Sequence, residues 1–289
     1  MRHDPSLARQ PDDTGFAQRG DVRLAYAVYG DGPTTVLLMP TWSMVHSRFW
    51  KAQIPYLARH HRVLTFDGRG NGRSSTPQGA AAYADAEFVA DAVAVMDATS
   101  TASAVLVALS AGAAWAVQMA ARYPGRVRGL VAIGPSTGLA VQQPERQRYS
   151  WDERLEQTEG WAKYNKHYWL EGDFDDFRRF FFDQMFSEPH STKPIEDCLE
   201  WSSGISAQTL ADTTAARLGL EGAVRQPIES FCVDVRCPVL VVHGTDDRIQ
   251  PDAAGARLAE LTGGSLVLLE GAGHCPQGRD PVKVNLLIR

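Results

Sequence analysis

The feature that most constrains the fold of this chain is a short apolar run that leads directly into a serine. Residues 104–109, AVLVAL, have the continuous hydrophobicity of a buried strand, and Ser110 follows at once. Residues 111–120 are mostly small or good helix formers, which predicts a helix. A strand that passes into a helix across one serine needs a sharp turn, where only small neighbours let the backbones pass closely. Ala108 and Gly112 meet that need.

The same alternation of strand and helix recurs along most of the chain. Apolar residues that alternate with others predict a half-buried strand over 22–28, and apolar runs predict strands over 34–39, 62–67, 127–133, 238–243 and 265–269. Helical spacing of apolar residues predicts helices over 47–60, 82–99 and 251–261. Strands that are apolar on both faces are typical of a parallel sheet covered on both sides. We therefore expect an α/β fold, with a mostly parallel sheet and helices on both faces.

A helical insertion interrupts this pattern. No clear buried strand occurs between about 138 and 225, and aromatic residues there repeat at i, i+3 and i+7, as in amphipathic helices. We expect a core of residues 15–137 and 226–289, a helical cap of 138–225, and a disordered lead over 1–14. Packing within the cap explains most of its rings. A minority should face the substrate, and we expect Trp42, Trp161, Tyr168 and Phe181 to bind it.

Composition excludes several classes of partner. The net charge is −5 and no run of Lys or Arg occurs, which argues against nucleic acid or an anionic membrane. No stretch of about 18 apolar residues exists, and the N-terminus lacks the apolar core of a signal peptide. The four cysteines show no metal-binding spacing, so reduced cytoplasmic thiols are expected. We expect no metal and no cofactor; the oligomeric state is left open.

Two later strands are followed by residues that could act together with Ser110. An acid, either Asp246 or Asp247, follows the strand predicted over 238–243, and His274 follows the last strand. The carboxyl ends of parallel strands meet at one edge of a sheet, where α/β proteins bind ligands. A serine, an acid and a histidine in this chain order form a known arrangement for nucleophilic catalysis.

Four motifs together carry a resemblance to a known family. They are D-x-R-G-x-G-x-S at 67–74, the serine turn at 108–112 with alanine in place of the first glycine of G-x-S-x-G, G-x-x-D at 244–247, and G-x-G-H at 271–274. Over about 20–135 and 230–289 the chain resembles the α/β-hydrolase superfamily, in particular the capped branch that includes proline iminopeptidases, cofactor-free haloperoxidases and carbon–carbon bond hydrolases.

The resemblance implies roles for particular residues. The triad would be Ser110, Asp247 and His274, with Asp247 preferred over Asp246 as the acid. The oxyanion hole would pair the Ala111 amide with that of Thr41 or Trp42. Pro40 stands where the family usually has glycine, and it has no N–H to donate.

We therefore expect a cytoplasmic serine hydrolase that cleaves an ester, thioester or lactone with a sizeable apolar part, a small-molecule acyl substrate, through an acyl-enzyme at Ser110. Acyl transfer or carbon–carbon bond cleavage on the same triad is an alternative. A second alternative is a non-catalytic ligand-binding or accessory domain of a larger protein, since fold does not settle function. Labelling by a fluorophosphonate probe discriminates between catalysis and binding alone.

Overall fold

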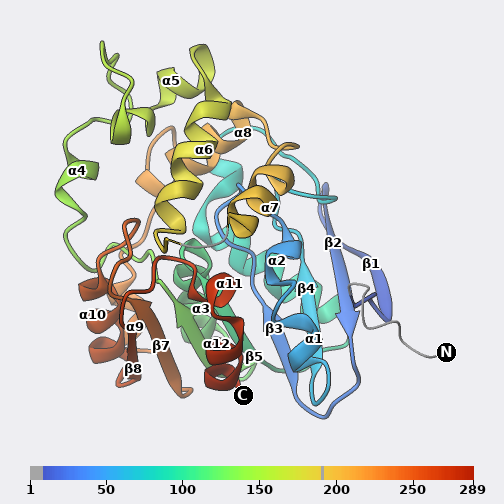
Figure 1. The fold of residues 1–289 in the computed structure, drawn as a ribbon. Coiled ribbons are helices and arrows are strands. Elements are labelled where there is room, and N and C mark those ends of the chain that lie inside the picture. Colours follow the sequence, from blue (N-terminus) through green and yellow to red (C-terminus); the bar gives the residue numbers. More distant parts are fainter. Residues whose placement is uncertain (1–8, 190–191) are drawn as a thin grey trace.

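One sheet organises the part of the chain that the computed structural model describes, residues 9–189 and 192–289. Its strand order is β1-β2-β4-β3-β5-β6-β7-β8 (Figure 1). The strands are β1 (Asp13–Arg19), β2 (Val22–Tyr29), β3 (Thr35–Leu38), β4 (Arg62–Phe66), β5 (Ala104–Leu109), β6 (Val127–Ile133), β7 (Val239–Gly244) and β8 (Ser265–Leu269). β1 pairs antiparallel with β2, and β2 pairs antiparallel with β4; every other pairing in this sheet is parallel. The expected fold class is confirmed.

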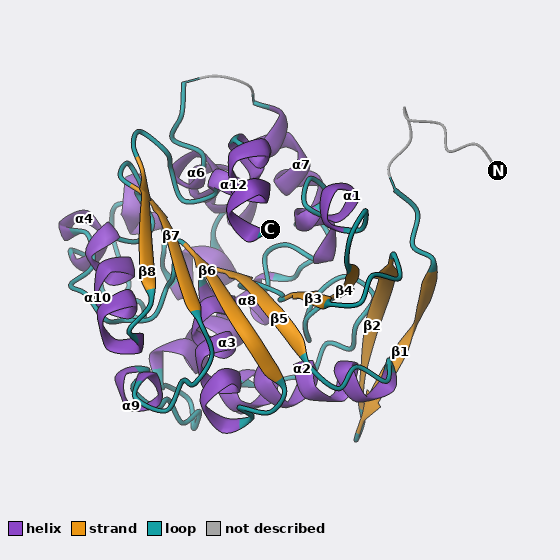
Figure 2. Ribbon diagram, turned by 90° about the horizontal axis from the view of Figure 1, so that it is seen from below, coloured by secondary structure: helices purple, strands orange, loops and turns teal. Residues whose placement is uncertain are grey.

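Helices cover both faces of the sheet, because successive strand residues point to opposite sides. Leu106 belongs to the apolar cluster on one face, while its neighbour Val107 belongs to the cluster on the other. Figure 2 shows α2, α3, α9 and α10 on the first side, and α1 and α12 on the second. These helices and the short α11 are α1 (Ile54–Leu57), α2 (Asp85–Ala98), α3 (Ala111–Arg122), α9 (Glu229–Cys232), α10 (Asp252–Thr262), α11 (Pro276–Arg279) and α12 (Pro281–Ile288).

The segment between β6 and β7 contains the helices α4 to α8. They are α4 (Pro144–Gln147), α5 (Lys166–Glu171), α6 (Phe174–Met185), α7 (Lys193–Trp201) and α8 (Ala207–Leu218), with a 3-10 turn at Gly160–Lys163. Figure 1 shows α5 to α8 gathered at one end of the sheet. Most of the rings in this segment pack on one another; the centroid of Trp169, for example, lies 4.4 Å from that of Phe177 and 4.6 Å from that of Trp151. Across the described residues no helix is both long and apolar enough to cross a membrane.

Three local features differ from the sequence expectations. The helix expected over 47–60 is two short pieces, a 3-10 turn at Ser47–Trp50 and α1, because Pro55 cannot donate within a continuing helix and is placed at the start of α1. β1 was not expected, and it begins two residues before the core start predicted at 15. Residues 1–8 of the expected disordered lead lie outside the described residues.

The glycine-rich motif at 67–74 forms a braced loop after β4. The Arg69 guanidinium, almost fully buried, donates to both oxygens of buried Asp91, with N–O distances of 2.7 Å. Nδ2 of Asn71 donates to the Ser43 carbonyl oxygen at 2.6 Å. The motif therefore anchors the turn after β3, in which the Thr41 hydroxyl donates to the Leu109 carbonyl next to Ser110.

Candidate active site

Ser110 occupies a strained turn between β5 and α3. Its φ of 53° and ψ of −117° are rare for a residue with a side chain. The surrounding backbone holds the turn: the Ser110 N–H donates to the Ile133 carbonyl at 2.9 Å, and the Ser136 N–H donates to the Ser110 carbonyl at 3.0 Å. A Cβ on Gly112 would lie 2.3 Å from the Pro40 carbonyl oxygen, so glycine is required there. The turn places Ser110 at the end of β5, where it lines a cavity.

Asp247 and His274 form a buried pair. The His274 Nδ1 lies 2.7 Å from Asp247 Oδ2, while Asp247 Oδ1 accepts from the backbone amides of Ile249 at 2.7 Å and Gln250 at 2.9 Å. Asp246, in contrast, is exposed. Of the two acids left open by the residue pattern, Asp247 is the one the structure brings to the histidine.

Gly134, which follows β6, places the His274 ring near the serine turn. A Cβ on Gly134 would lie 3.1 Å from His274 Nδ1, so the ring packs against this backbone directly. Ile133, one residue earlier, is the residue that accepts the Ser110 N–H. The Ser110 hydroxyl itself makes no hydrogen bond to another described residue. Catalytic hydrogen bonds are often long or misaligned before substrate binds.

A second histidine, His243, shares the carboxylate of Asp247. Its Nε2 lies 3.0 Å from Asp247 Oδ2 and 3.2 Å from the Gln250 carbonyl oxygen, which can only accept, so Nε2 carries the proton. Burial alone would raise the pKa of Asp247. The charge of His274 and hydrogen bonds from both imidazoles outweigh burial and hold that pKa well below its usual range. Sequence reasoning gave His243 no role.

Replacing His243 by leucine is expected to make the protein more sensitive to acid. A depressed carboxyl pKa contributes stability that is present above the unfolded-state value of about 3.9 and is lost as pH falls through the folded-state pKa. Removing one hydrogen-bond donor raises the folded-state pKa of Asp247. The His243→Leu protein should therefore lose about 1.5–3 kcal/mol of stability at neutral pH. On acidification it should unfold at a higher pH than the wild type. Circular dichroism against pH measures this. The exposed His60→Leu is the control, and equal acid midpoints for the two variants would contradict the assignment.

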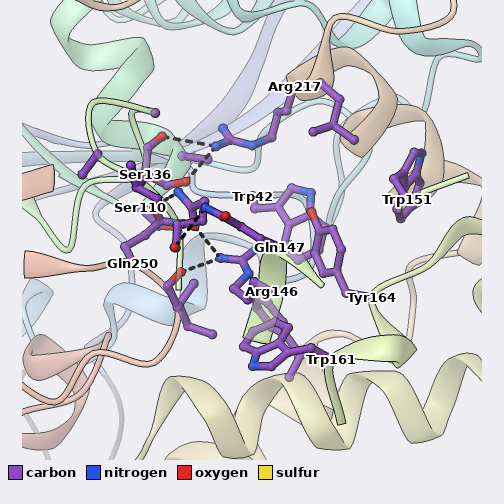
Figure 3. Close-up of a pocket in the computed structure, with 18 of the residues that line it drawn as sticks. Trp42, Ser110, Ser136, Arg146, Gln147, Trp151, Trp161, Tyr164, Arg217 and Gln250 are labelled. Carbon is purple, nitrogen blue, oxygen red and sulfur yellow. Dashed lines mark hydrogen bonds between the residues drawn. The ribbon is translucent and has the colours of Figure 1, made fainter. Parts of the chain in front are cut away.

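A cavity of about 520 Å³ opens beside Ser110. Its walls include Ala111 from the core and the ring of Phe181. Figure 3 shows three further rings of the lining, those of Trp42, Trp161 and Tyr164. Three of the four aromatic residues expected to bind substrate therefore line it. The fourth, Tyr168, does not: its hydroxyl donates to Asp176 at 2.7 Å, and it borders a separate surface pocket beside α5. Helical spacing put Tyr168 on the face of Trp161, but the chain there is a 3-10 turn followed by α5, so the two rings diverge.

The turn after β3 holds unpaired amides next to Ser110. The Thr41 hydroxyl donates to the Leu109 carbonyl at 3.0 Å, and Trp42 Nε1 lies 3.2 Å from Thr213 Oγ1. The backbone N–H groups of Thr41 and Trp42 donate to no other described residue. Trp42 and Ala111 both line the cavity, whereas Thr41 is buried and does not. The Ala111 amide is in the first turn of α3 and has no partner within the helix.

Other cavity residues escaped the sequence analysis. Arg146, Arg217, Ser136 and Gln250 all line the space beside Ser110. None belongs to a catalytic motif or an aromatic periodicity, so the sequence carried no signal for them. Over residues 9–189 and 192–289, no group of three or more His, Cys, Asp or Glu side chains is arranged to hold a metal ion.

Comparison with known proteins places the chain among related folds. Residues 34–281 match the family model described as alpha/beta hydrolase fold. A Variovorax paradoxus protein provisionally named carbamate hydrolase RutD is 27% identical over 267 residues, covering 87% of this chain and 89% of the relative. The structure of Est816, described as an N-acyl homoserine lactone degrading enzyme, aligns with a TM-score of 0.77 at 23% identity, covering 95% of this chain and 99% of that one. The structure of the enol-lactonase from Burkholderia xenovorans LB400 aligns with a TM-score of 0.76 at 20% identity, covering 95% of this chain and 98% of that one.

Proposed function

Because this chain belongs to the α/β-hydrolase family, we propose that it is a serine hydrolase that cleaves a small ester, thioester or lactone through an acyl-enzyme at Ser110. The observation that carries the proposal is the buried Asp247–His274 pair, set against the backbone next to the strained Ser110 turn. A carboxylate that orients an imidazole beside a serine hydroxyl is the arrangement that activates serine as a nucleophile.

The reaction then runs in two halves. His274 Nε2 takes the hydroxyl proton as Ser110 Oγ attacks the substrate carbonyl, and Asp247 stabilises the imidazolium that forms. The tetrahedral oxyanion accepts hydrogen bonds from the Ala111 amide and from an amide of the turn after β3. His274 returns the proton to the leaving oxygen or sulfur as the acyl–leaving-group bond breaks. Water, deprotonated by the same imidazole, attacks the acyl-enzyme and releases the acid and free Ser110.

The cavity supports a substrate of limited size with an apolar part. A space of about 520 Å³ is in the range of small-molecule sites. Rings on the walls, such as Trp161 and Phe181, would contact that apolar part, and the segment that carries them, residues 138–225, would act as a specificity cap. Relatives named for the hydrolysis of a carbamate and of lactones support cleavage at an acyl carbon.

A fluorophosphonate probe tests the proposal directly. We expect it to label Ser110 at one equivalent per chain, identified by mass spectrometry, and we expect labelling to be lost in His274→Ala, because the hydroxyl is then no longer activated. A panel of p-nitrophenyl esters and γ-lactones measures turnover. If folded protein shows neither labelling nor turnover, the proposed hydrolase function is wrong and a ligand-binding module takes its place.

A further inference from the structure

The cavity beside Ser110 contains two arginines that the proposed reaction does not use. Arg146 comes from α4, and Arg217 comes from the last turn of α8. Both line the same cavity as Ser110, and Figure 3 shows the two guanidinium groups on either side of the serine. They are held there by different parts of the chain, so their convergence is a property of the folded protein.

Each guanidinium is fixed through one of its nitrogens. Arg146 donates through Nη1 to the Ile249 carbonyl and, at 3.3 Å, to Gln142 Oε1. Its guanidinium carbon lies 4.7 Å from the ring centroid of Trp161 and 5.2 Å from that of Tyr164.

Arg217 donates through Nη2 to Ser136, at 2.9 Å to Oγ and 3.2 Å to the carbonyl oxygen. A guanidinium has five N–H donors, so both arginines keep donors for a ligand.

No described carboxylate neutralises these cations. Among the described residues, neither guanidinium lies within ion-pair distance of an Asp or Glu. The acids whose charge reaches them are already engaged: Asp247 binds two histidines, and Asp85 accepts from Trp115 Nε1 at 2.7 Å and Gln118 Nε2 at 3.2 Å. Burial lowers the pKa of both arginines, which is the sign of cations with poor compensation.

The local charge is opposite to that of the whole protein. The chain carries a net charge of −5, yet a third arginine, the exposed Arg225, also borders this cavity. Removing cations from water without a counter-ion is costly, so an anion that enters this space would recover part of the cost. A cationic cavity in an acidic protein therefore favours the binding of an anionic ligand.

We propose that the substrate carries a carboxylate that Arg146 and Arg217 hold while its ester or lactone carbonyl lies at Ser110, an assignment that rests on the proposed hydrolase function. The planar guanidinium fork of arginine matches the geometry of a carboxylate, which can accept two parallel N–H···O bonds from it. The rings of Trp161 and Tyr164 then contact the aliphatic carbons between the two groups. The preferred substrates are monoesters or lactones of dicarboxylic acids, not neutral esters.

Two esters that differ only in this charge test the proposal. Mono-p-nitrophenyl adipate has a free carboxylate, and methyl p-nitrophenyl adipate has the same chain with that carboxylate capped. We expect kcat/KM to favour the free acid by about 10- to 100-fold, the range of a hydrogen bond to a charged group. Arg146→Gln and Arg217→Gln should each lower the ratio of the two kcat/KM values toward one, because the free acid loses more than the methyl ester. Arg148→Gln, an exposed arginine outside the cavity, is the matched control.

The ratio of kcat/KM for the free acid to kcat/KM for the methyl ester distinguishes a role in substrate recognition from a structural role. If Arg217 only fastens the loop at Ser136 to α8, Arg217→Gln would slow both esters equally, the ratio would stay at its wild-type value, and the proposal would be overturned. A wild-type protein with no preference for the free acid over the methyl ester would also overturn the proposal.

If neither ester reacts and Ser110 is not labelled, the proposed function fails, and calorimetric titration of adipate into Ser110→Ala decides the arginine site separately. Binding that disappears in the Ser110→Ala, Arg217→Gln double variant supports it. No binding, or tighter binding of inorganic phosphate than of adipate, contradicts it.

Discussion

Ser110→Ala is expected to lower kcat on an activated ester by about 10⁴- to 10⁶-fold while leaving the fold intact. The side chain is half-buried and makes no hydrogen bond to another described residue, so its removal costs little stability. Alanine at the same backbone position retains the positive φ, and the turn is held by backbone contacts to Ile133 and Ser136. Turnover of a p-nitrophenyl ester, with circular dichroism as a check of folding, measures the effect.

Variants of the other two residues sharpen this test. Asp247→Asn and His274→Ala should also be severely impaired, and combining either with Ser110→Ala should add little, because the three groups act as one unit. Asp246→Asn is the matched control, since the exposed Asp246 carboxylate is adjacent in sequence and absent from the pair with His274. Loss of activity in Asp246→Asn with normal activity in Asp247→Asn would reverse the assignment of the acid.

Gly112→Ala is expected to lower kcat by about 100- to 1000-fold, the cost of one misplaced oxyanion donor. The new methyl would lie 2.3 Å from the Pro40 carbonyl oxygen, so either the turn after β3 or the first turn of α3 must move. Both carry amides proposed to bind the oxyanion: Trp42 or Thr41 in the turn, and Ala111 in the helix. Steady-state kinetics should show the loss mainly in kcat, since these amides act on the transition state.

Gly125→Ala provides the comparison for Gly112→Ala. A Cβ at Gly125 meets no atom within 4 Å, so this variant introduces the same methyl group without a clash. It should match the wild type in kcat. A Gly112→Ala protein with wild-type kcat would show that the spacing between Pro40 and α3 does not set the rate, and would remove the turn after β3 from the proposed oxyanion hole.

The central part of the fold was predictable because its strands are buried on both faces. β3, β5 and β7 are almost entirely buried apolar runs, and hydrophobicity marks such strands directly. β1 gave no such signal: it is an edge strand in which Phe16 remains substantially exposed, so its sequence carries little alternation. The region around Pro55 gave a misleading signal. Apolar residues at helical spacing continue across Pro55, but a proline cannot continue a helix, so the helix is broken there.

The part of the candidate site that was most directly predictable is the part that the sheet itself positions. Ser110, Asp247 and His274 each follow a strand, and the carboxyl ends of parallel strands converge. Arg146 and Arg217 come from the insertion, where helix orientation depends on packing among rings and leaves no mark in the sequence. Tyr168 was misplaced for the same reason, because its direction is decided by where α5 begins. His243 was visible as a residue, but its contact with Asp247 required the three-dimensional arrangement.

The insertion between β6 and β7 also has a consequence for how this protein folds. It separates Ser110 in the chain from both Asp247 and His274, so the three groups meet only after a long loop has been closed, and closing it costs chain entropy. Contacts that are distant in sequence form late and slowly. A chain with β2 to β6 already paired would therefore hold its serine turn without its acid and base. Recovery of enzymatic activity during refolding should then lag behind recovery of secondary structure.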